Sequence, residues 1–427
     1  MLKNLLWALR YPSFVSPSNI VGEYAVGAIQ TRIPPTASST DNHNPQLSPS
    51  CQIHYPTLPG TSATTDDGDD DDTEKTATKH PYFRPQAVQG MANYTRQSAP
   101  LLEFLSQRSH PCNMNAPPIP DAKFPIVIVS HGLGGCMEMY TELCQQIASQ
   151  GYWVLAVEHG DGSGAYAETP HGEPIYYQRP PDAPAYSREK VVHFRKPFLQ
   201  HRVQEIQTVL DFIFSLQSEN NNNNNNNNDN ELVRKVFDAA DTKIKEGTTQ
   251  GQIHLLGHSF GGATMVLASQ DAVLTSKYSI QSLALCDCWA FSLDEPVLER
   301  GIRDIPTLSL LSEAWVTNPE TRQVQQLLQN SSSVLQGSYF VPHSVHTSFS
   351  DATHWLPGFA TRRMQLRGIK EHKHETIRTT ALACVEHMAT QQSERRRITD
   401  NTEQDDAVTT ETTATLLKKG KLQEFPV

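Results

Sequence analysis

The chain has 427 residues and a formal net charge of −11, from 35 lysines and arginines against 46 aspartates and glutamates. This excess of negative charge argues against a nucleic-acid-binding surface. No apolar run approaches the roughly 20 residues that cross a bilayer, so we expect no membrane-spanning helix. The seven cysteines are sparse and odd in number, which favours a reducing compartment over a disulfide framework. We therefore expect a cytoplasmic protein.

Low-complexity segments divide the chain. Residues 61–79 carry six aspartates between Asp66 and Asp72, and residues 220–228 are an uninterrupted asparagine run. Such segments cannot bury enough apolar surface to offset the entropy lost on ordering. We expect one domain over 20–390, with flexible insertions near 38–46, 61–79 and 217–232 and a flexible C-terminal tail over 391–427. In the N-terminal segment 1–19 the apolar stretch is too short for a signal-peptide core, and a membrane-touching role for this end stays open.

Strand-like and helix-like segments alternate along the rest of the chain. The β-branched run 124–130 is typical of a strand buried on both faces, and helical spacing over 140–150 ends at Gly151, a C-cap residue. In chain order we expect strands at 152–157, 253–256, 282–286, 307–311 and 338–341, and helices at 196–216, 261–269, 319–330 and 375–388. This alternation predicts an α/β fold, with a mainly parallel central sheet and helices on both faces.

The segment Gly257-His-Ser-Phe-Gly261 has the Gly-x-Ser-x-Gly pattern of a nucleophile elbow. A predicted strand precedes it and a predicted helix follows it, as this motif requires. Gly257 and Gly261 let the strand and the helix approach without side-chain clashes. Ser259 is then a candidate nucleophile at the N-terminal end of a helix, where backbone amides and the helix dipole favour negative charge.

A second glycine-rich segment, Ser130-His-Gly-Leu-Gly-Gly135, directly follows the predicted strand 124–130. An oxyanion hole needs one N–H from the residue after the nucleophile and another from a loop that follows an early strand. We predict that Phe260 and Leu133 donate these two amides.

A serine nucleophile needs a histidine base and an acid that orients it, in the chain order serine, acid, histidine. Among Asp287, Asp294 and Asp304, Asp287 directly follows a predicted strand and is our choice for the acid. The histidine candidates are His343, His346 and His354, and a position just beyond the last core strand favours the first two. We expect His131, His159 and His258 to shape or cap the motifs beside them.

Metal-binding patterns are weak in this sequence. The pairs His343–His346 and His372–His374 lack further ligands at metal spacing, and Cys286 and Cys288 are too close together for a usual zinc site. We therefore predict no metal and no cofactor.

Several segments in order resemble the calcium-independent platelet-activating-factor acetylhydrolase family, within the α/β-hydrolase superfamily. They are Ser130–Gly134, Gly151–His159, Gly257–Thr264, Leu285–Trp289 and Ser344–Asp351, with early segments Gly22–Gly27 and Ile53–Pro56. The resemblance implies an α/β-hydrolase fold, with Ser259 as nucleophile, Asp287 as acid and His346 as base. It selects His346 over His343.

The resemblance also implies a serine esterase that hydrolyses the sn-2 ester of phospholipids with short or oxidised acyl chains. Such a substrate lies at a lipid surface, so peripheral membrane contact is expected. The candidates for it are Trp355, Leu356, Phe359 and Met364 and, at the N-terminus, Leu5, Leu6 and Trp7. Two alternatives stay open: a general short-chain carboxylesterase similar to dienelactone hydrolases, and an inactive hydrolase-fold interaction protein. The oligomeric state stays open as well.

Overall fold

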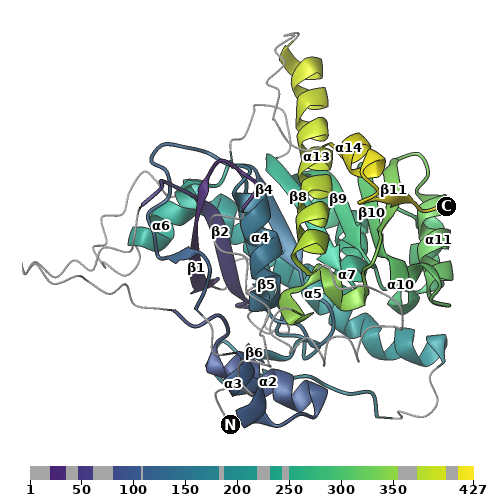
Figure 1. The fold of residues 1–427 in the computed structure, drawn as a ribbon, viewed down its shortest axis with the longest axis horizontal. Coiled ribbons are helices and arrows are strands. Elements are labelled where there is room, and N and C mark those ends of the chain that lie inside the picture. The colour runs from purple at the N-terminus through teal and green to yellow at the C-terminus, as the bar shows by residue number, and fades with distance from the viewer. Residues whose placement is uncertain are drawn as a thin grey trace, which may run out of the picture.

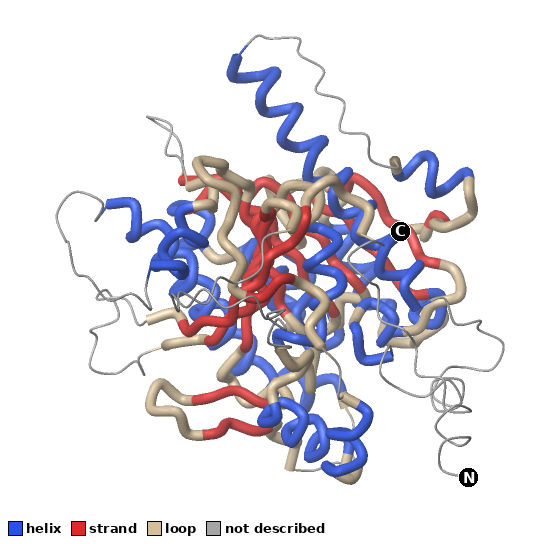
Figure 2. Tube along the Cα trace, turned by 60° about the vertical axis from the view of Figure 1, so that its left-hand side comes forward, coloured by secondary structure: helices blue, strands red, loops and turns tan. Residues whose placement is uncertain are grey.

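The computed structural model of the chain describes residues 20–34, 47–60, 80–106, 109–181, 187–218, 231–242, 250–353, 373–400 and 412–427. A central sheet lies between layers of helices (Figures 1 and 2). No helix within these ranges is long and apolar enough to cross a membrane. The predicted insertions near 38–46, 61–79 and 217–232 and the N-terminal segment 1–19 lie wholly or largely outside the described residues.

The sheet has ten strands in the order β12-β11-β10-β9-β8-β4-β5-β2-β1-β3. Neighbours from β5 to β11 run parallel, whereas β2 is antiparallel to both β5 and β1, and β12 is antiparallel to β11. The strand bounds are Ala25–Arg32 (β1), Ser50–Thr57 (β2), Asn113–Met114 (β3), Ile126–Ser130 (β4), Trp153–Glu158 (β5), Gln250–His258 (β8), Tyr278–Cys286 (β9), Thr307–Ser312 (β10), Leu335–Val341 (β11) and Gln423–Glu424 (β12). A separate hairpin joins β6 (Tyr166–Glu168) and β7 (Pro174–Tyr176).

The continuous apolar strands are explained by burial on both faces of the sheet. On β4, Ile126 and Ile128 point into one core, and Val127 and Val129 point into the other. Parallel strands need crossover connections, and these are the helices that cover each face. The predicted α/β fold with a mainly parallel sheet is thus confirmed.

Helices cover both faces. On one face α4 (Thr141–Ala148) packs beside the long α13 (Lys373–Asp400), and Figure 1 shows these two helices in front of the strands. On the other face lie α5 (Arg188–Ser218) and α7 (Phe260–Gln270), which are in contact with each other. The other helical elements are η3 (Met137–Tyr140), α6 (Glu231–Asp238), α8 (Ala272–Lys277), η5 (Ala290–Ser292), α9 (Glu295–Arg300), α10 (Glu313–Val316), α11 (Thr321–Asn330), η6 (His346–Phe349) and η7 (Asp351–Thr353).

Two short helices that the sequence did not indicate, α2 (Pro85–Thr95) and α3 (Ala99–Leu105), form a small third cluster with the β6–β7 hairpin. They lie together at the bottom of Figure 1. Buried apolar side chains of α2, among them Val88 and Met91, hold this cluster on the main domain.

The prediction of a flexible tail over 391–427 is wrong for its last residues. Thr412 caps α14 (Thr413–Lys418) by accepting a hydrogen bond from the Thr415 amide. The next residues add β12 to the edge of the sheet beside β11, and Leu416, Leu422 and Phe425 are buried. These few apolar positions are enough to dock a segment whose average composition is polar.

Candidate active site

Ser259 lies in the tight turn between β8 and α7, with φ 57° and ψ −119°. A positive φ is rare for a residue other than glycine and is typical of strained functional positions. A Cβ on Gly261 would lie 2.0 Å from the Ser130 carbonyl oxygen, and one on Gly257 would lie 2.3 Å from the Gly261 carbonyl oxygen. Both positions therefore admit only glycine, as the elbow motif predicts.

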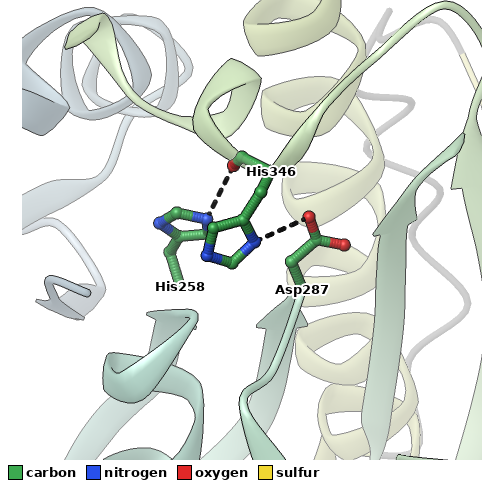
Figure 3. Close-up of side chains that lie close together, drawn as sticks. All are labelled: His258, Asp287 and His346. Carbon is green, nitrogen blue, oxygen red and sulfur yellow. Dashed lines mark hydrogen bonds and ion pairs between the residues drawn. The ribbon is translucent and has the colours of Figure 1, made fainter. Parts of the chain in front are cut away.

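The three predicted triad residues meet at the carboxyl edge of the parallel strands. His346 Nε2 lies 2.9 Å from Ser259 Oγ, and His346 Nδ1 lies 3.1 Å from Asp287 Oδ2. Figure 3 shows the His346 ring between Asp287 and the end of β8. The Asp287 side chain is fully buried, whereas that of His346 is 32% exposed. The base is thus reachable from solvent and its acid is not.

Asp287 is fixed by the end of the neighbouring strand β10. The Ser312 amide donates to Asp287 Oδ1 at 2.6 Å, and the Ser312 hydroxyl donates to Oδ2 at 2.6 Å. Because these two hydrogen bonds fix the orientation of the carboxylate, Asp287 can orient the Nδ1–H of His346. No local sequence pattern indicates the role of Ser312, because its contact with Asp287 is made between the ends of two neighbouring strands.

The other candidate acids and bases lie elsewhere. Asp294 precedes α9 and pairs with Lys196 at the surface, and Asp304 precedes β10 at the opposite edge of the sheet. The His343 side chain is 54% exposed and faces Glu313. His354 lies outside the described residues, as do Trp355, Leu356, Phe359 and Met364 and the N-terminal Leu5, Leu6 and Trp7. Their expected lipid contacts stay a prediction.

The glycine-rich loop after β4 lies directly against the nucleophile. A Cβ on Gly132 would lie 3.0 Å from Ser259 Cβ. The amides of Gly132, Gly134 and Gly135 donate to Tyr140 Oη, the Ser163 carbonyl and the Gly132 carbonyl. Among the described residues, the Leu133 amide has no such acceptor, and the Phe260 amide is in the first turn of α7, where helix amides lack partners. These two amides are therefore the ones available to hold an oxyanion, and that role stays a prediction.

Aromatic rings enclose the base. Trp315 of α10 stacks on the His346 ring, with ring centroids 4.4 Å apart and an interplanar angle of 20°. The centroid of the His258 ring lies 4.7 Å from that of the His346 ring. Burial and the nearby His346 lower the pKa of His258 well below its usual value, so His258 stays neutral. Sequence reasoning missed Trp315, because α10 is only four residues long.

His258, Asp287 and His346 place ligand-type atoms within 4.8 Å of one another, as metal sites do. Their donor atoms are already engaged, however. His258 Nδ1 meets Tyr140 Oη and its Nε2 meets the His346 carbonyl, while His346 bonds Ser259 and Asp287. These hydrogen bonds explain the cluster as two members of the candidate triad with His258 beside them, so we assign no metal to it.

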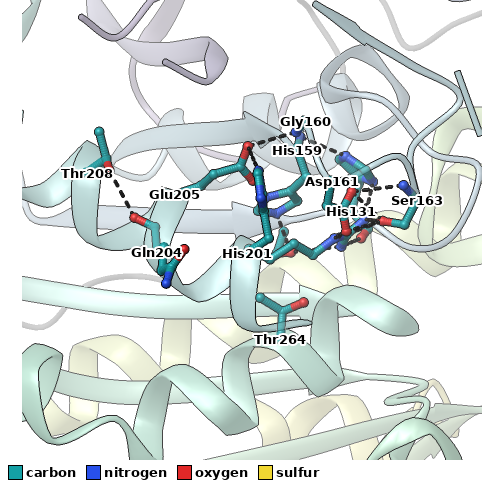
Figure 4. A network of polar contacts seen from close by, with 12 residues as sticks. His131, His159, Gly160, Asp161, Ser163, His201, Gln204, Glu205, Thr208 and Thr264 are labelled. Atoms are coloured by element: carbon teal, nitrogen blue, oxygen red, sulfur yellow. Dashed lines mark hydrogen bonds and ion pairs between the residues drawn. The ribbon is translucent and has the colours of Figure 1, made fainter. Parts of the chain in front are cut away.

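A buried polar network, part of which Figure 4 shows, contacts His131 at the start of the glycine-rich loop. Arg202 of α5 is fully buried, pairs with Asp161 at 2.9 Å and donates to the His131 carbonyl at 2.6 Å. Its guanidinium also lies over the Phe260 ring, 4.8 Å from the centroid. One cation thus contacts both segments that carry the predicted oxyanion-hole amides.

The second half of this network is a hydrogen-bonded series of Ser130, His159 and Glu205. His159 Nε2 lies 2.8 Å from Ser130 Oγ, and His159 Nδ1 lies 2.7 Å from Glu205 Oε2. Burial lowers the pKa of His159 well below its usual value and raises that of Glu205. Although this series copies the order of a triad, Ser130 is fully buried and cannot reach a substrate. We assign it to positioning the loop.

Replacing Arg202 with methionine is expected to destabilise the fold by about 3–5 kcal/mol, because the Asp161 carboxylate is then buried without its partner. Urea unfolding measures this change. As a matched control, Arg188→Met removes an exposed pair with Glu295 and should cost less than about 1 kcal/mol. Adding Asp161→Leu to Arg202→Met should recover stability; an additive further loss would contradict this reading.

Ion pairs and hydrogen bonds tie the α2–α3 cluster to the site. Arg84, at the start of α2, pairs with the buried Glu138 and Glu158, and the Tyr82 hydroxyl bonds Asp351 Oδ2 at 2.5 Å, just beyond η6. A Cβ on Gly134 would lie 2.3 Å from the Tyr94 ring of α2. Helix α2 therefore flanks the glycine-rich loop at the catalytic edge.

The chain is similar in sequence to known proteins over most of its length. The family model described as platelet-activating factor acetylhydrolase, isoform II, matches residues 53–412. A platelet-activating factor acetylhydrolase of Gallus gallus is 27% identical over 307 residues, which cover 67% of this chain and 67% of that protein. A protein described as a putative phospholipase A2 of Schizosaccharomyces pombe is 26% identical over 286 residues, 58% of this chain and 63% of that protein. The chain thus matches about two thirds of the length of these two relatives.

Among solved structures, a ferulic acid esterase from Streptomyces cinnamoneus superposes with a TM-score of 0.51 at 16% sequence identity. The match covers 97% of this chain and 100% of that one. At this identity the likeness concerns the fold alone, and it agrees with the expected α/β-hydrolase architecture.

Proposed function

Because the chain belongs to the family of platelet-activating factor acetylhydrolase, isoform II, we propose that it is a serine esterase that cleaves the sn-2 ester of phospholipids with short or oxidised acyl chains. The observation that carries this proposal is the Ser259–His346–Asp287 geometry in a chain of this family. Beside it lie the Leu133 and Phe260 amides, which have no hydrogen-bond acceptor among the described residues. The complete hydrogen-bonded series also argues against an inactive hydrolase-fold interaction protein.

The proposed reaction is acyl transfer in two steps. His346 Nε2 takes the Ser259 proton while Oγ attacks the ester carbonyl, and the oxyanion is held by the Leu133 and Phe260 amides. Collapse of this intermediate breaks the sn-2 C–O bond, and His346 gives its proton to the leaving lysophospholipid oxygen. Water, activated by His346, then hydrolyses the acyl-serine to a free carboxylic acid. Each step uses side chains and amides of the chain, so turnover should persist in a calcium chelator.

A choice between substrate classes tests the proposal. The enzyme should release lysophosphatidylcholine from 1-alkyl-2-acetyl-phosphatidylcholine aggregates faster than it cleaves a soluble nitrophenyl acetate, and it should be slow on long-chain phosphatidylcholine. Turnover of the nitrophenyl ester alone would keep the triad but assign the chain to general carboxylesterases. Failure on every ester, by a folded protein, would overturn the proposal.

We assign the lipid-facing surface to α3. Leu101 and Phe104 are 48% and 44% exposed, on a helix that packs against α2 at the catalytic edge. Large apolar side chains exposed beside a site for an aggregated substrate suit insertion into a lipid surface. This surface belongs to the region 81–120, in which the sequence indicated no helix.

Exchanging both residues for serine tests this assignment. Leu101→Ser with Phe104→Ser should lower partitioning to phosphatidylcholine vesicles by at least about tenfold and leave nitrophenyl acetate turnover unchanged. Val273→Ser, which alters a 51% exposed valine on α8, is the matched control and should partition as the wild type does. Equal partitioning of all three proteins would remove α3 from the docking surface.

A further inference from the structure

Tyr140 is a buried residue whose hydroxyl contacts both the glycine-rich loop and the end of β8, which carries the nucleophile. It is the last residue of η3 and is 2% exposed. Its hydroxyl lies 3.1 Å from the Gly132 amide and 2.7 Å from His258 Nδ1. Gly132 belongs to the loop against Ser259, and His258 precedes Ser259 in the chain. One hydroxyl therefore bridges the glycine-rich loop and the strand that carries the nucleophile.

The directions of these hydrogen bonds follow from the chemistry of the partners. The Gly132 N–H can only donate, so Tyr140 Oη accepts there. His258 Nε2 lies 3.0 Å from the His346 carbonyl oxygen, which can only accept, so Nε2 carries the proton. A neutral His258 then has an unprotonated Nδ1, and this nitrogen accepts the Tyr140 hydroxyl proton. The series runs in one direction, from the Gly132 amide through Tyr140 and His258 to the backbone of His346.

This order has two consequences for the base. It anchors the backbone carbonyl of His346 at the first residue of η6, while the side chain of the same residue bonds Ser259 and Asp287. It also occupies Nδ1 of His258, whose ring lies only 4.7 Å from the His346 ring. A second cation at that distance would oppose the imidazolium that forms on His346 during turnover.

We propose that Tyr140 is a positioning residue that couples the glycine-rich loop after β4 to His346 through His258. By donating to Nδ1, the hydroxyl stabilises the tautomer of His258 whose Nε2–H holds the His346 carbonyl, and it links that carbonyl to the Gly132 amide. The inference rests on the proposed function insofar as it assigns Ser259 and His346 their roles. It adds a residue that contacts none of the reacting atoms.

A double-mutant cycle with Tyr140→Phe and His258→Phe tests the coupling. The readout is the rate at which a fluorophosphonate labels Ser259, because this reaction needs the activated serine and the oxyanion hole but no ester substrate. Each single variant should label about 10- to 100-fold more slowly than the wild type, as misplacement of reacting groups by a fraction of an ångström does. The double variant should be within about threefold of the slower single variant, since both changes break one series.

Steady-state kinetics on nitrophenyl acetate separate positioning from packing. Tyr140→Phe should lower kcat by a factor similar to that of the labelling rate and change KM by less than about threefold. Tyr55→Phe is the matched control, because it removes another fully buried phenol hydroxyl, which donates to the Ala116 carbonyl. It should lose comparable thermal stability and keep the wild-type labelling rate.

A labelling rate for Tyr140→Phe within about twofold of the wild type, or a double-variant loss equal to the product of the two single losses, would overturn the coupling. If Tyr140→Phe alone does not fold, the same change can be made in the His258→Phe protein, because both partners of the hydrogen bond are then apolar. A labelling rate there that is a further tenfold below that of His258→Phe would also overturn the coupling. Labelling that responds as expected, in a protein that hydrolyses no phospholipid, would keep the coupling and reject the proposed substrate.

Discussion

Replacing Ser259 with alanine is expected to lower kcat on 1-alkyl-2-acetyl-phosphatidylcholine by about 10⁶-fold, the loss seen when a triad serine is removed. The physical reason is that no other described hydroxyl lies within reach of His346 Nε2, which bonds Ser259 Oγ at 2.9 Å. The residual rate would come from the amides of Leu133 and Phe260 acting on bound substrate. Initial rates of lysophospholipid release measure the effect.

The matched control for this variant is Ser276→Ala, because the Ser276 hydroxyl bonds only its own helix, α8. It should retain the wild-type rate. Circular dichroism should show both variants folded, since Ser259 makes no side-chain cap on α7. A Ser259→Ala protein with more than about one hundredth of the wild-type activity would exclude Ser259 as the nucleophile.

Replacing Asp287 with asparagine is expected to lower kcat by about 10⁴-fold, since an amide in the place of the acid favours the wrong histidine tautomer. The Ser312 amide can only donate, so it holds the asparagine oxygen at the place of Asp287 Oδ1. The NH₂ group then takes the place of Oδ2 and donates to His346 Nδ1, which must be unprotonated to accept it. The kcat and KM values on nitrophenyl acetate measure this loss without a lipid surface.

Asp294→Asn is the corresponding control. Asp294 was the next candidate acid, but the structure places it in a surface ion pair with Lys196. Its replacement should leave kcat within about twofold of the wild type, because exposed pairs contribute little. Losses of equal size in the two variants would contradict the assignment of Asp287.

The strands and helices of the central sheet could be predicted because their sequence patterns are long and regular. The four residues from Ile126 to Val129 are apolar on both faces of β4, and the spacing in 196–216 matches the buried stripe of α5. The elbow could be predicted because local sterics demand glycine at 257 and 261. In these places local sequence and tertiary packing require the same residues.

The residues whose roles could not be predicted from the sequence depend on long-range contacts. Ser312, Trp315 and Tyr140 each reach the site from a different element, and no local pattern indicates their partners. Arg202 lies between apolar positions of α5, and its charge is compensated by Asp161, 41 residues away in the chain. The C-terminal residues were expected to be flexible because a few buried side chains, such as Leu416 and Phe425, are diluted by polar neighbours.

All seven cysteines are free and buried, which is compatible with a reducing compartment. The cytoplasmic location therefore stays a proposal.

The most direct test of the account is labelling of the wild-type protein with a fluorophosphonate, in the presence and absence of 1-alkyl-2-acetyl-phosphatidylcholine micelles, followed by peptide mapping. We expect one label, on Ser259, which forms more slowly when the phospholipid competes for the site. A label on another residue, or a Ser259 label whose rate the phospholipid does not change, would contradict it.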